Sequence, residues 1–251
     1  MSSQAMKYSS APELCYTELS VGVMQLPQPG VGVIRKKMLS ALRLRGTFVW
    51  SNNMDELMKC ATAFDKLLNV QYRIVVAKKG TMKKIILSFN SCDFHHLAGL
   101  GKLKDLSVSR ENRDNVYNRI IQGNITGHIV KQSRYYICID NRFEPLSALE
   151  SLIDSNEIVF RYNSKKNVHS MIDADYLLSS KHNNNDVYIF LKEKQDSLYF
   201  CRSFFPKDTK DYTAGQSRYT LLYKEKVFVS DNRSEIQINR LTDTELNLFF
   251  C

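Results

Sequence analysis

The 251-residue sequence lacks the features of a membrane or secreted protein. No run approaches the ~18 consecutive apolar residues that a membrane-spanning helix needs. Residues 1–12 show neither the cationic start nor the apolar stretch of a secretory signal. Hydrophobic residues make up 43% of the chain and charged residues 24%, which is typical of soluble globular proteins. We therefore expect a soluble, cytoplasmic protein with one or two domains.

The cysteines and histidines lack the spacings that hold metal ions. None of the six cysteines forms a CxxC pair, and the five histidines include no HExxH motif. Scattered cysteines in a chain without a secretory signal indicate reduced, mostly buried thiols. We expect no metal site and no cofactor.

Two glycine-containing segments lack the residues of a nucleotide-binding loop. The segment 99–102 (GLGK) ends like a Walker A loop, but His96 stands at the position of its first glycine. Leu103 occupies the position of the Ser or Thr that would hold magnesium. Gly30 and Gly32 lack the third glycine and the preceding strand of a dinucleotide fingerprint. The sequence therefore argues against nucleoside-triphosphate and NAD sites.

The net charge indicates a polyanionic partner. Lys and Arg total 35 against 26 Asp and Glu, a formal charge of +9, and such an excess suits nucleic acid. Residues 34–45 carry five cations and no acid. Two interpretations of the segment 1–52 are open. It is a basic arm that binds phosphates or a membrane surface, or it is a flexible leader outside the fold. The flexible leader is favoured. We place the folded domain at residues 53–251.

The residue pattern predicts an α+β fold with a mainly antiparallel sheet and N-terminal helices. Asn53 and Glu56 resemble a capping box at the start of a helix that extends to residue 68. Strands at 72–77 and 82–89 flank a tight turn. The other helices are expected at 93–103, capped by Asp93; at 110–121, capped by Ser109; and at 145–153. The other strands are expected at 157–162, 186–192, 197–204 and 217–229.

The first motif whose side chains could take part in catalysis is the segment 94–103. If its apolar residues share one helix face, His95 and His96 point in different directions, and one of them can face solvent. Lys102 and Lys104 follow within reach of the same opening. A neutral histidine beside lysines tends to have a lowered pKa, which suits a general base. Alternatively, one histidine packs in the core and the other is exposed without a role.

The second motif is the segment 199–207, followed by residues 211–216. Strand alternation predicts two faces: Cys201, Ser203 and Phe205 on one, and Phe200, Arg202 and Phe204 on the other. A permanent charge that is surrounded by aromatic residues, such as that of Arg202, needs an anionic partner. Asp208 or Asp211 satisfies it structurally, or a phosphate satisfies it functionally. The strand 217–226, which interleaves cations with aromatics, fits single-stranded nucleic acid or a solvated sheet face.

These motifs together resemble a known nuclease family. FHHLAGLGKLKDL at 94–106, CRSFFPKDTKDYTAGQ at 201–216 and LLYKEK at 221–226 resemble the phage-associated branch of the barnase–EndoU–colicin E5/D–RelE-like (BECR) nucleases. The resemblance covers roughly residues 53–228 and places the protein among those of bacterial and prophage genomes. It implies a BECR-like ribonuclease domain that cleaves RNA by attack of the 2′-hydroxyl, without a metal ion.

The resemblance also implies roles for individual residues. In the expected catalytic set, His96 is the base or acid, Arg202 clamps the phosphate and Ser203 orients an oxygen. The expected substrate-binding set comprises Lys102, Lys104, Lys207, Tyr212 and Gln216. The expected substrates are tRNA, rRNA or mRNA, with an antitoxin or immunity protein as partner if the enzyme is a toxin. The alternatives are an RNA- or partner-binding module that has lost cleavage, and a phage accessory protein that binds a host factor.

Overall fold

The computed structural model describes residues 55–167 and 170–250. The predicted leader and Asn53 lie outside these ranges. The helices are α1 Glu56–Leu67, α2 Ser91–Leu97, α3 Arg113–Ile121, α4 Gly127–Lys131, α5 Phe143–Ser147, α6 Leu149–Asp154 and α7 Asp243–Phe250. The strands are β1 Val70–Lys78, β2 Thr81–Ser88, β3 Val159–Arg161, β4 Tyr176–His182, β5 Asn185–Gln195, β6 Leu198–Pro206, β7 Ser217–Phe228 and β8 Ser234–Asn239. None of the helices in the described ranges is long and apolar enough to cross a membrane.

The strands form one sheet that closes on itself. Their order is β1-β2-β6-β5-β4-β3-β7-β8, and β1 also pairs with β7. The β2–β6 pair is parallel, through Ile86 with Leu198 and Leu87 with Tyr199, and the other pairs are antiparallel. The α+β class is confirmed, and the sheet is mainly antiparallel as expected, but it is closed and barrel-like, which the sequence did not predict. Strand patterns specify which face is buried but not which strands become neighbours.

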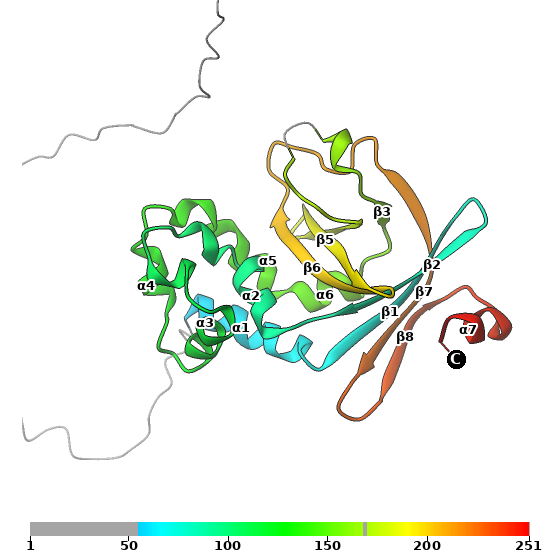
Figure 1. Cartoon of the computed structure of the whole chain (residues 1–251), viewed down its shortest axis with the longest axis horizontal. Helices are drawn as coiled ribbons and strands as arrows, with labels where there is room; N and C mark the ends of the chain where they lie inside the picture. Colours follow the sequence, from blue (N-terminus) through cyan, green and yellow to red (C-terminus); the bar gives the residue numbers. More distant parts are fainter. Residues whose placement is uncertain (1–54, 168–169, 251) are drawn as a thin grey trace, which may run out of the picture. The chain divides into compact units, whose positions relative to one another are not determined.

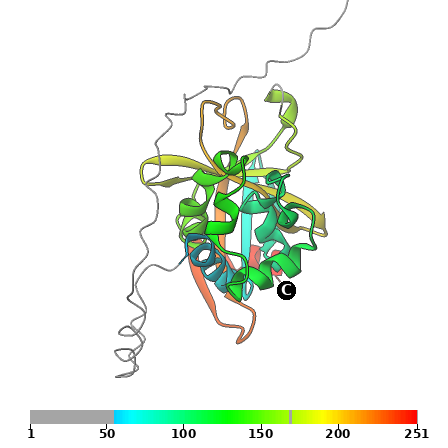
Figure 2. The same cartoon turned by 90° about the vertical axis from the view of Figure 1, so that its left-hand side faces the viewer.

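The order of the first elements is as predicted, a helix, a hairpin and then further helices, but a helix also follows the last strand. The β1–β2 hairpin comes between α1 and α2, and α7 follows the last strand. Helices α1 to α5 nevertheless gather on one side of the closed sheet (Figures 1 and 2). The predicted helix at 145–153 is two short helices, α5 and α6. Helices α4 and α7 and strands β4 and β8 were not among the predicted elements.

The ends of the elements differ from the predicted caps. Helix α1 is capped by Asp55, whose carboxylate accepts from the N–H groups of Leu57 and Met58. Asn90 rather than Asp93 caps α2, and Asn112 rather than Ser109 caps α3. Each predicted cap stood near another Asn or Asp that can also accept these bonds. Tertiary contacts help to decide the choice, since the Asp55 carboxylate also accepts from the Gly127 N–H of α4.

Two apolar clusters occupy different faces of the sheet. The larger cluster joins the helices to the sheet and includes Phe64, Phe94 and Phe204. The smaller cluster is built on Tyr188 and Phe190 of β5 and two further buried residues, with Phe205 and Tyr212 packed against it. Neighbouring residues of β6, Phe204 and Phe205, therefore serve different clusters. This strand carries the second sequence motif and borders the candidate site.

Candidate active site

Strand β6 contains a bulge at Arg202. Phe190 of β5 lies opposite Ser203, and the next residue, Leu191, lies opposite Cys201, so Arg202 has no partner in β5. A β-bulge interrupts strict alternation and redirects side chains. Cys201 and Phe204 consequently both belong to the larger cluster. The predicted face shared by Cys201, Ser203 and Phe205 is wrong for Cys201, because the bulge lies between Cys201 and Ser203.

The two adjacent histidines occupy different environments. His95 is only 4% exposed, and its Nε2 lies 2.8 Å from the carbonyl oxygen of Val108. His95 is therefore a core residue, and burial lowers its pKa. His96 is exposed at the end of α2, which packs against β6. Of the two, His96 is the histidine that can reach a substrate.

The environment of His96 favours its neutral form. Partial desolvation lowers its pKa, and the positive charges of Arg202, Arg113 and Arg142 lower it further. A hydrogen bond with the backbone of Arg202 opposes this shift. His96 and Arg202 are therefore neighbours, although 106 positions separate them in the sequence (202 − 96). A neutral imidazole beside arginines can accept a proton while the cations attract a phosphate.

Arg202 does not form either predicted ion pair. Its side chain is exposed, and none of the ion pairs formed within the described ranges includes it. Asp211 instead lies 3.6 Å from Lys207 and accepts a hydrogen bond from the Tyr188 hydroxyl. The charge of Arg202 contributes to the lowered pKa of Asp173, so a carboxylate lies within its electrostatic reach without forming an ion pair. The exposed guanidinium remains accessible to an anion from outside the chain.

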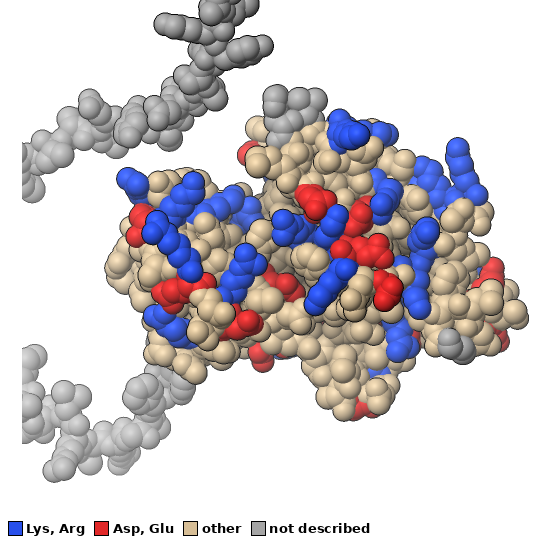
Figure 3. All heavy atoms as spheres, in the orientation of Figure 1, with Lys and Arg blue, Asp and Glu red and all other residues tan. Residues whose placement is uncertain are grey.

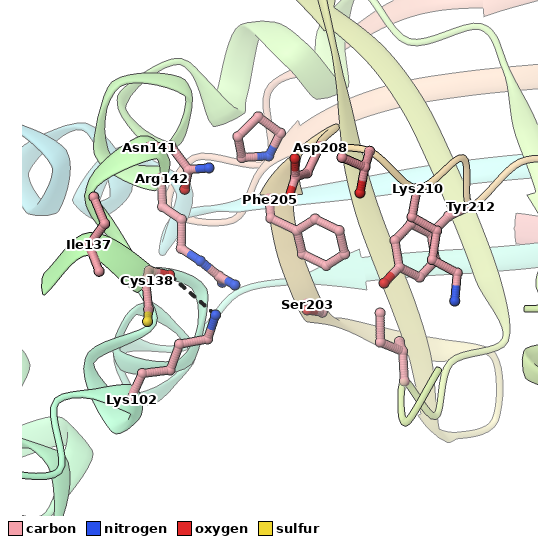
Figure 4. Close-up of a pocket in the computed structure, with 13 residues that line it drawn as sticks. Lys102, Ile137, Cys138, Asn141, Arg142, Ser203, Phe205, Asp208, Lys210 and Tyr212 are labelled. Carbon is pink, nitrogen blue, oxygen red and sulfur yellow. Dashed lines mark hydrogen bonds between the residues drawn. The ribbon is translucent and has the colours of Figure 1, made fainter. Parts of the chain in front are cut away.

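A pocket of about 610 Å³ lies next to β6 (Figure 4). Three of the predicted residues line it: Lys102, Ser203 and Tyr212. Lys102 and Arg142 enter from the helical side, whereas Phe205 and Tyr212 form the opposite side. The lining includes three cations, Lys102, Arg142 and Lys210, and one carboxylate, Asp208. The excess positive charge suits an anionic ligand.

Arg142 is the residue of this pocket that sequence reasoning missed. It follows α4 in a short 3₁₀ turn, Asp140–Arg142, and is 8% exposed. Its Nη1 donates to the Phe204 carbonyl at 2.9 Å and to the Leu97 carbonyl at 3.4 Å. Burial lowers its pKa, and none of the ion pairs within 55–167 and 170–250 includes it. A buried guanidinium without a carboxylate partner is unusual.

Gly99 of the first motif makes room for Arg142. Its φ is +76°, and a Cβ added there would stand 2.8 Å from Ile139 Cγ2 and 3.3 Å from Arg142 Cδ. Both the left-handed backbone and the close approach require glycine. The glycine of the first motif thus shapes the pocket without binding a nucleotide itself.

Lys102 lies close to Arg142, and both side chains are positively charged. The Lys102 ammonium donates to the Cys138 carbonyl at 3.2 Å. Desolvation and the charge of Arg142 both lower the pKa of Lys102. Two like charges held together disfavour one another unless an anion lies between them.

A family model matches most of the chain, including all of these residues. The family model described as "phage-Barnase-EndoU-ColicinE5/D-RelE like nuclease4" matches residues 56–241. The chain belongs to this nuclease family. The matched range includes the neighbours His96 and Arg202 and the whole lining of the pocket. Comparison with curated proteins and with solved structures gave no significant match.

The other five predicted residues, His96 and Arg202 among them, lie outside the pocket lining. Lys104 is exposed. Lys207 lies 3.3 Å from Asp186 and 3.6 Å from Asp211. The Gln216 amide bonds to both the N–H and the carbonyl of Asn163. Lys207 and Gln216 therefore brace the loops beside the pocket.

The predicted basic strand of the nuclease is largely internal. Lys224 and Lys226 of β7 are buried and cannot form the solvated, base-stacking face that the pattern allowed. Cations elsewhere spread over the surface, with acidic groups interspersed on the face shown in Figure 3. Within the described part of the chain, no three His, Cys, Asp or Glu side chains gather in a metal-binding group.

Proposed function

We propose that residues 53–251 form an endoribonuclease that cleaves RNA by attack of a 2′-hydroxyl on the adjacent phosphate, without a metal ion. The observation that supports this proposal is the proximity of His96, whose pKa is lowered, to Arg202, which forms no ion pair in the described ranges. Membership of a nuclease family supports a nucleic-acid substrate.

In this reaction His96 accepts the proton of the 2′-hydroxyl. The 2′-oxygen then forms a bond to phosphorus, the bond between phosphorus and the 5′-oxygen breaks, and solvent returns a proton to the leaving oxygen. Arg202 stabilises the charge that develops on the phosphate, and Ser203 orients one of its oxygens. General acid–base catalysis supplies roughly 10²- to 10⁴-fold, and charge stabilisation a comparable factor.

The test incubates purified protein with tRNA and rRNA in EDTA and separates the products by size. We expect discrete fragments from the wild type and about 10²-fold slower cleavage by His96→Ala. His128→Ala is the matched control, because His128 is an exposed histidine of α4. This variant should cleave like the wild type.

The outcomes separate the two candidate classes. RNA binding without fragments would support a binding module in place of an enzyme. Equal loss of cleavage in both histidine variants would contradict the role of His96. An antitoxin or immunity partner stays a prediction, tested by co-expression with neighbouring genes.

A further inference from the structure

The pocket beside β6 has two chemically different sides. One side, from the helical layer, carries the Lys102 ammonium and the Arg142 guanidinium. The other side carries the rings of Phe205 and Tyr212 together with Ile172. The volume of about 610 Å³ lies within the range of ligand pockets, which is roughly 300–1,000 Å³. A ligand that fills it must offer an anion to one side and an apolar surface to the other.

The cationic side is built around Arg142. Its Nη1 is held by two carbonyls, those of Leu97 and Phe204, which fixes the guanidinium. Within the described part of the chain, its other N–H groups make no protein hydrogen bond. Guanidinium groups match phosphate oxygens well, and preorganised ones lose less entropy on binding. Lys102 lies close enough to Arg142 for the charge of Arg142 to lower the pKa of Lys102.

The apolar side is an aromatic cluster that remains partly open. Phe205 stacks on Phe190 with ring centroids 5.5 Å apart, and Tyr212 meets Phe205 edge to face at 5.4 Å. Neither Phe205 nor Tyr212 is fully buried. The Arg142 guanidinium lies 5.6 Å from the Phe205 centroid, so the cationic and aromatic sides meet at this ring. Nucleobases pack on such aromatic and guanidinium surfaces.

We propose that this pocket holds one unpaired nucleotide of the RNA, with its phosphate between Arg142 and Lys102 and its base against Phe205 and Tyr212. Asp208, the carboxylate of the lining, accepts a hydrogen bond from the edge of the base. A base paired in a duplex cannot enter, because its faces are stacked and its edge is occupied. The proposal rests on the proposed function only in taking RNA as the ligand.

The test measures binding of the full-length protein to a short fluorescent strand with 2′-fluoro sugars, in EDTA. This strand lacks the attacking hydroxyl, so binding is measured without cleavage. We expect Lys102→Ala to weaken binding about tenfold and to reduce the salt slope by about 0.7, the value for one contact with a single strand. Tyr212→Leu should weaken binding about tenfold through lost stacking. The matched control Lys83→Ala, an exposed lysine of β2, should bind within about twofold of the wild type.

A strand without bases separates the two sides of the pocket. On that strand Tyr212→Leu should bind like the wild type, whereas Lys102→Ala should still be weaker. A duplex of the same sequence should bind at least about tenfold more weakly than the single strand. The proposal is overturned if the duplex binds as tightly, if Lys102→Ala matches Lys83→Ala, or if Tyr212→Leu has the same effect with and without bases.

Cleavage assays on natural RNA distinguish this proposal from the proposed function. If the wild type binds as described but does not cleave, the nuclease proposal fails and the nucleotide pocket stands. If it cleaves and both pocket variants keep the wild-type KM, the pocket proposal fails and the nuclease proposal stands. If the wild type binds no RNA at low salt, both fail.

Discussion

Two regions of this nuclease hold buried cations, and they differ in the partners that face those cations. In β7, Lys224 is 1% exposed and lies against the C-terminal end of α6. Its ammonium donates to three backbone carbonyls, those of Ile153, Asp154 and Asn156, at 2.9, 2.5 and 2.8 Å. Nearby, Lys226 lies 2.7 Å from Glu150 and 2.9 Å from Asp154. This region supplies its own acceptors.

The pocket beside β6 is the opposite case. Arg142 and Lys102 also donate to backbone carbonyls, but no carboxylate in the described ranges forms an ion pair with either. Both face an open volume. A cation whose acceptors are all internal stabilises the fold, whereas one that faces an opening without a counter-charge suits an external anion.

The largest expected effect is a contrast in stability between the two regions. Lys224→Met removes a donor from three carbonyls, of which that of Ile153 keeps the Asn156 N–H as a second donor. The loss should lower the free energy of unfolding by about 3–5 kcal/mol. Lys102→Ala, at an exposed position, should change it by less than about 0.5 kcal/mol. Urea denaturation followed by circular dichroism measures both. Similar values for the two variants would remove the distinction between the regions.

The next effect concerns activity at His96 and Arg202. Arg202→Ala should slow RNA cleavage about 10²-fold, which corresponds to roughly 2.7 kcal/mol in the barrier. The midpoint of its urea unfolding should not change, because Arg202 is exposed and lies in a β-bulge without a partner in β5. Arg134→Ala, another exposed arginine, is the control and should cleave normally. Wild-type rates for Arg202→Ala would contradict the phosphate-clamp role.

The local signals in the sequence were sufficient for part of this site. The hairpin was predicted, and Lys79 and Gly80 adopt the positive φ values, 50° and 79°, of a two-residue turn. The separation of His95 from His96 follows from helix geometry, because adjacent residues point about 100° apart around the axis. The segment 94–103 therefore predicted one core histidine and one accessible histidine.

Other features depend on contacts between distant residues. Arg142 follows the polar residues Asp140 and Asn141, which give no sign of its burial. Its guanidinium donates to the carbonyls of Leu97 and Phe204, which are 45 and 62 positions away. The bulge at Arg202 depends on the register with β5, which alternation alone does not specify. Closure of the sheet depends on the β1–β7 pairing. Sequence patterns cannot supply these facts, since they describe neighbours along the chain.

A smaller effect tests how Gly99 makes room for the cationic side of the pocket. Gly99→Ala and Gly80→Ala both place alanine at positive φ, 76° and 79°, but an added Cβ has nothing within 4 Å at Gly80. Gly80→Ala should cost about 1–2 kcal/mol of stability. Gly99→Ala should cost about 1–3 kcal/mol more, because the Cβ overpacks against Ile139 and Arg142. Equal losses in thermal or urea denaturation would show that backbone strain alone requires Gly99.

The smallest effect is a shift in the titration of His96. The positive charge of Arg202 contributes to lowering the pKa of His96 below 6.5. Removing that charge makes the protonated form less unfavourable, so Arg202→Ala should raise the pKa of His96. Protonation then sets in at a higher pH as the solution is acidified. NMR titration of the ring measures this shift, with Arg134→Ala as control, and an unchanged or lower pKa would contradict the assigned contact.

The identity of the product ends tests the central claim most directly. Attack by a 2′-hydroxyl leaves a 2′,3′-cyclic phosphate on one fragment and a 5′-hydroxyl on the other. Mass spectrometry of RNA cleaved by the wild type in EDTA should show these ends at every cut, and substrates with 2′-fluoro sugars should stay intact. Fragments with 3′-hydroxyl and 5′-phosphate ends, or cleavage that needs added magnesium, would contradict the proposed mechanism.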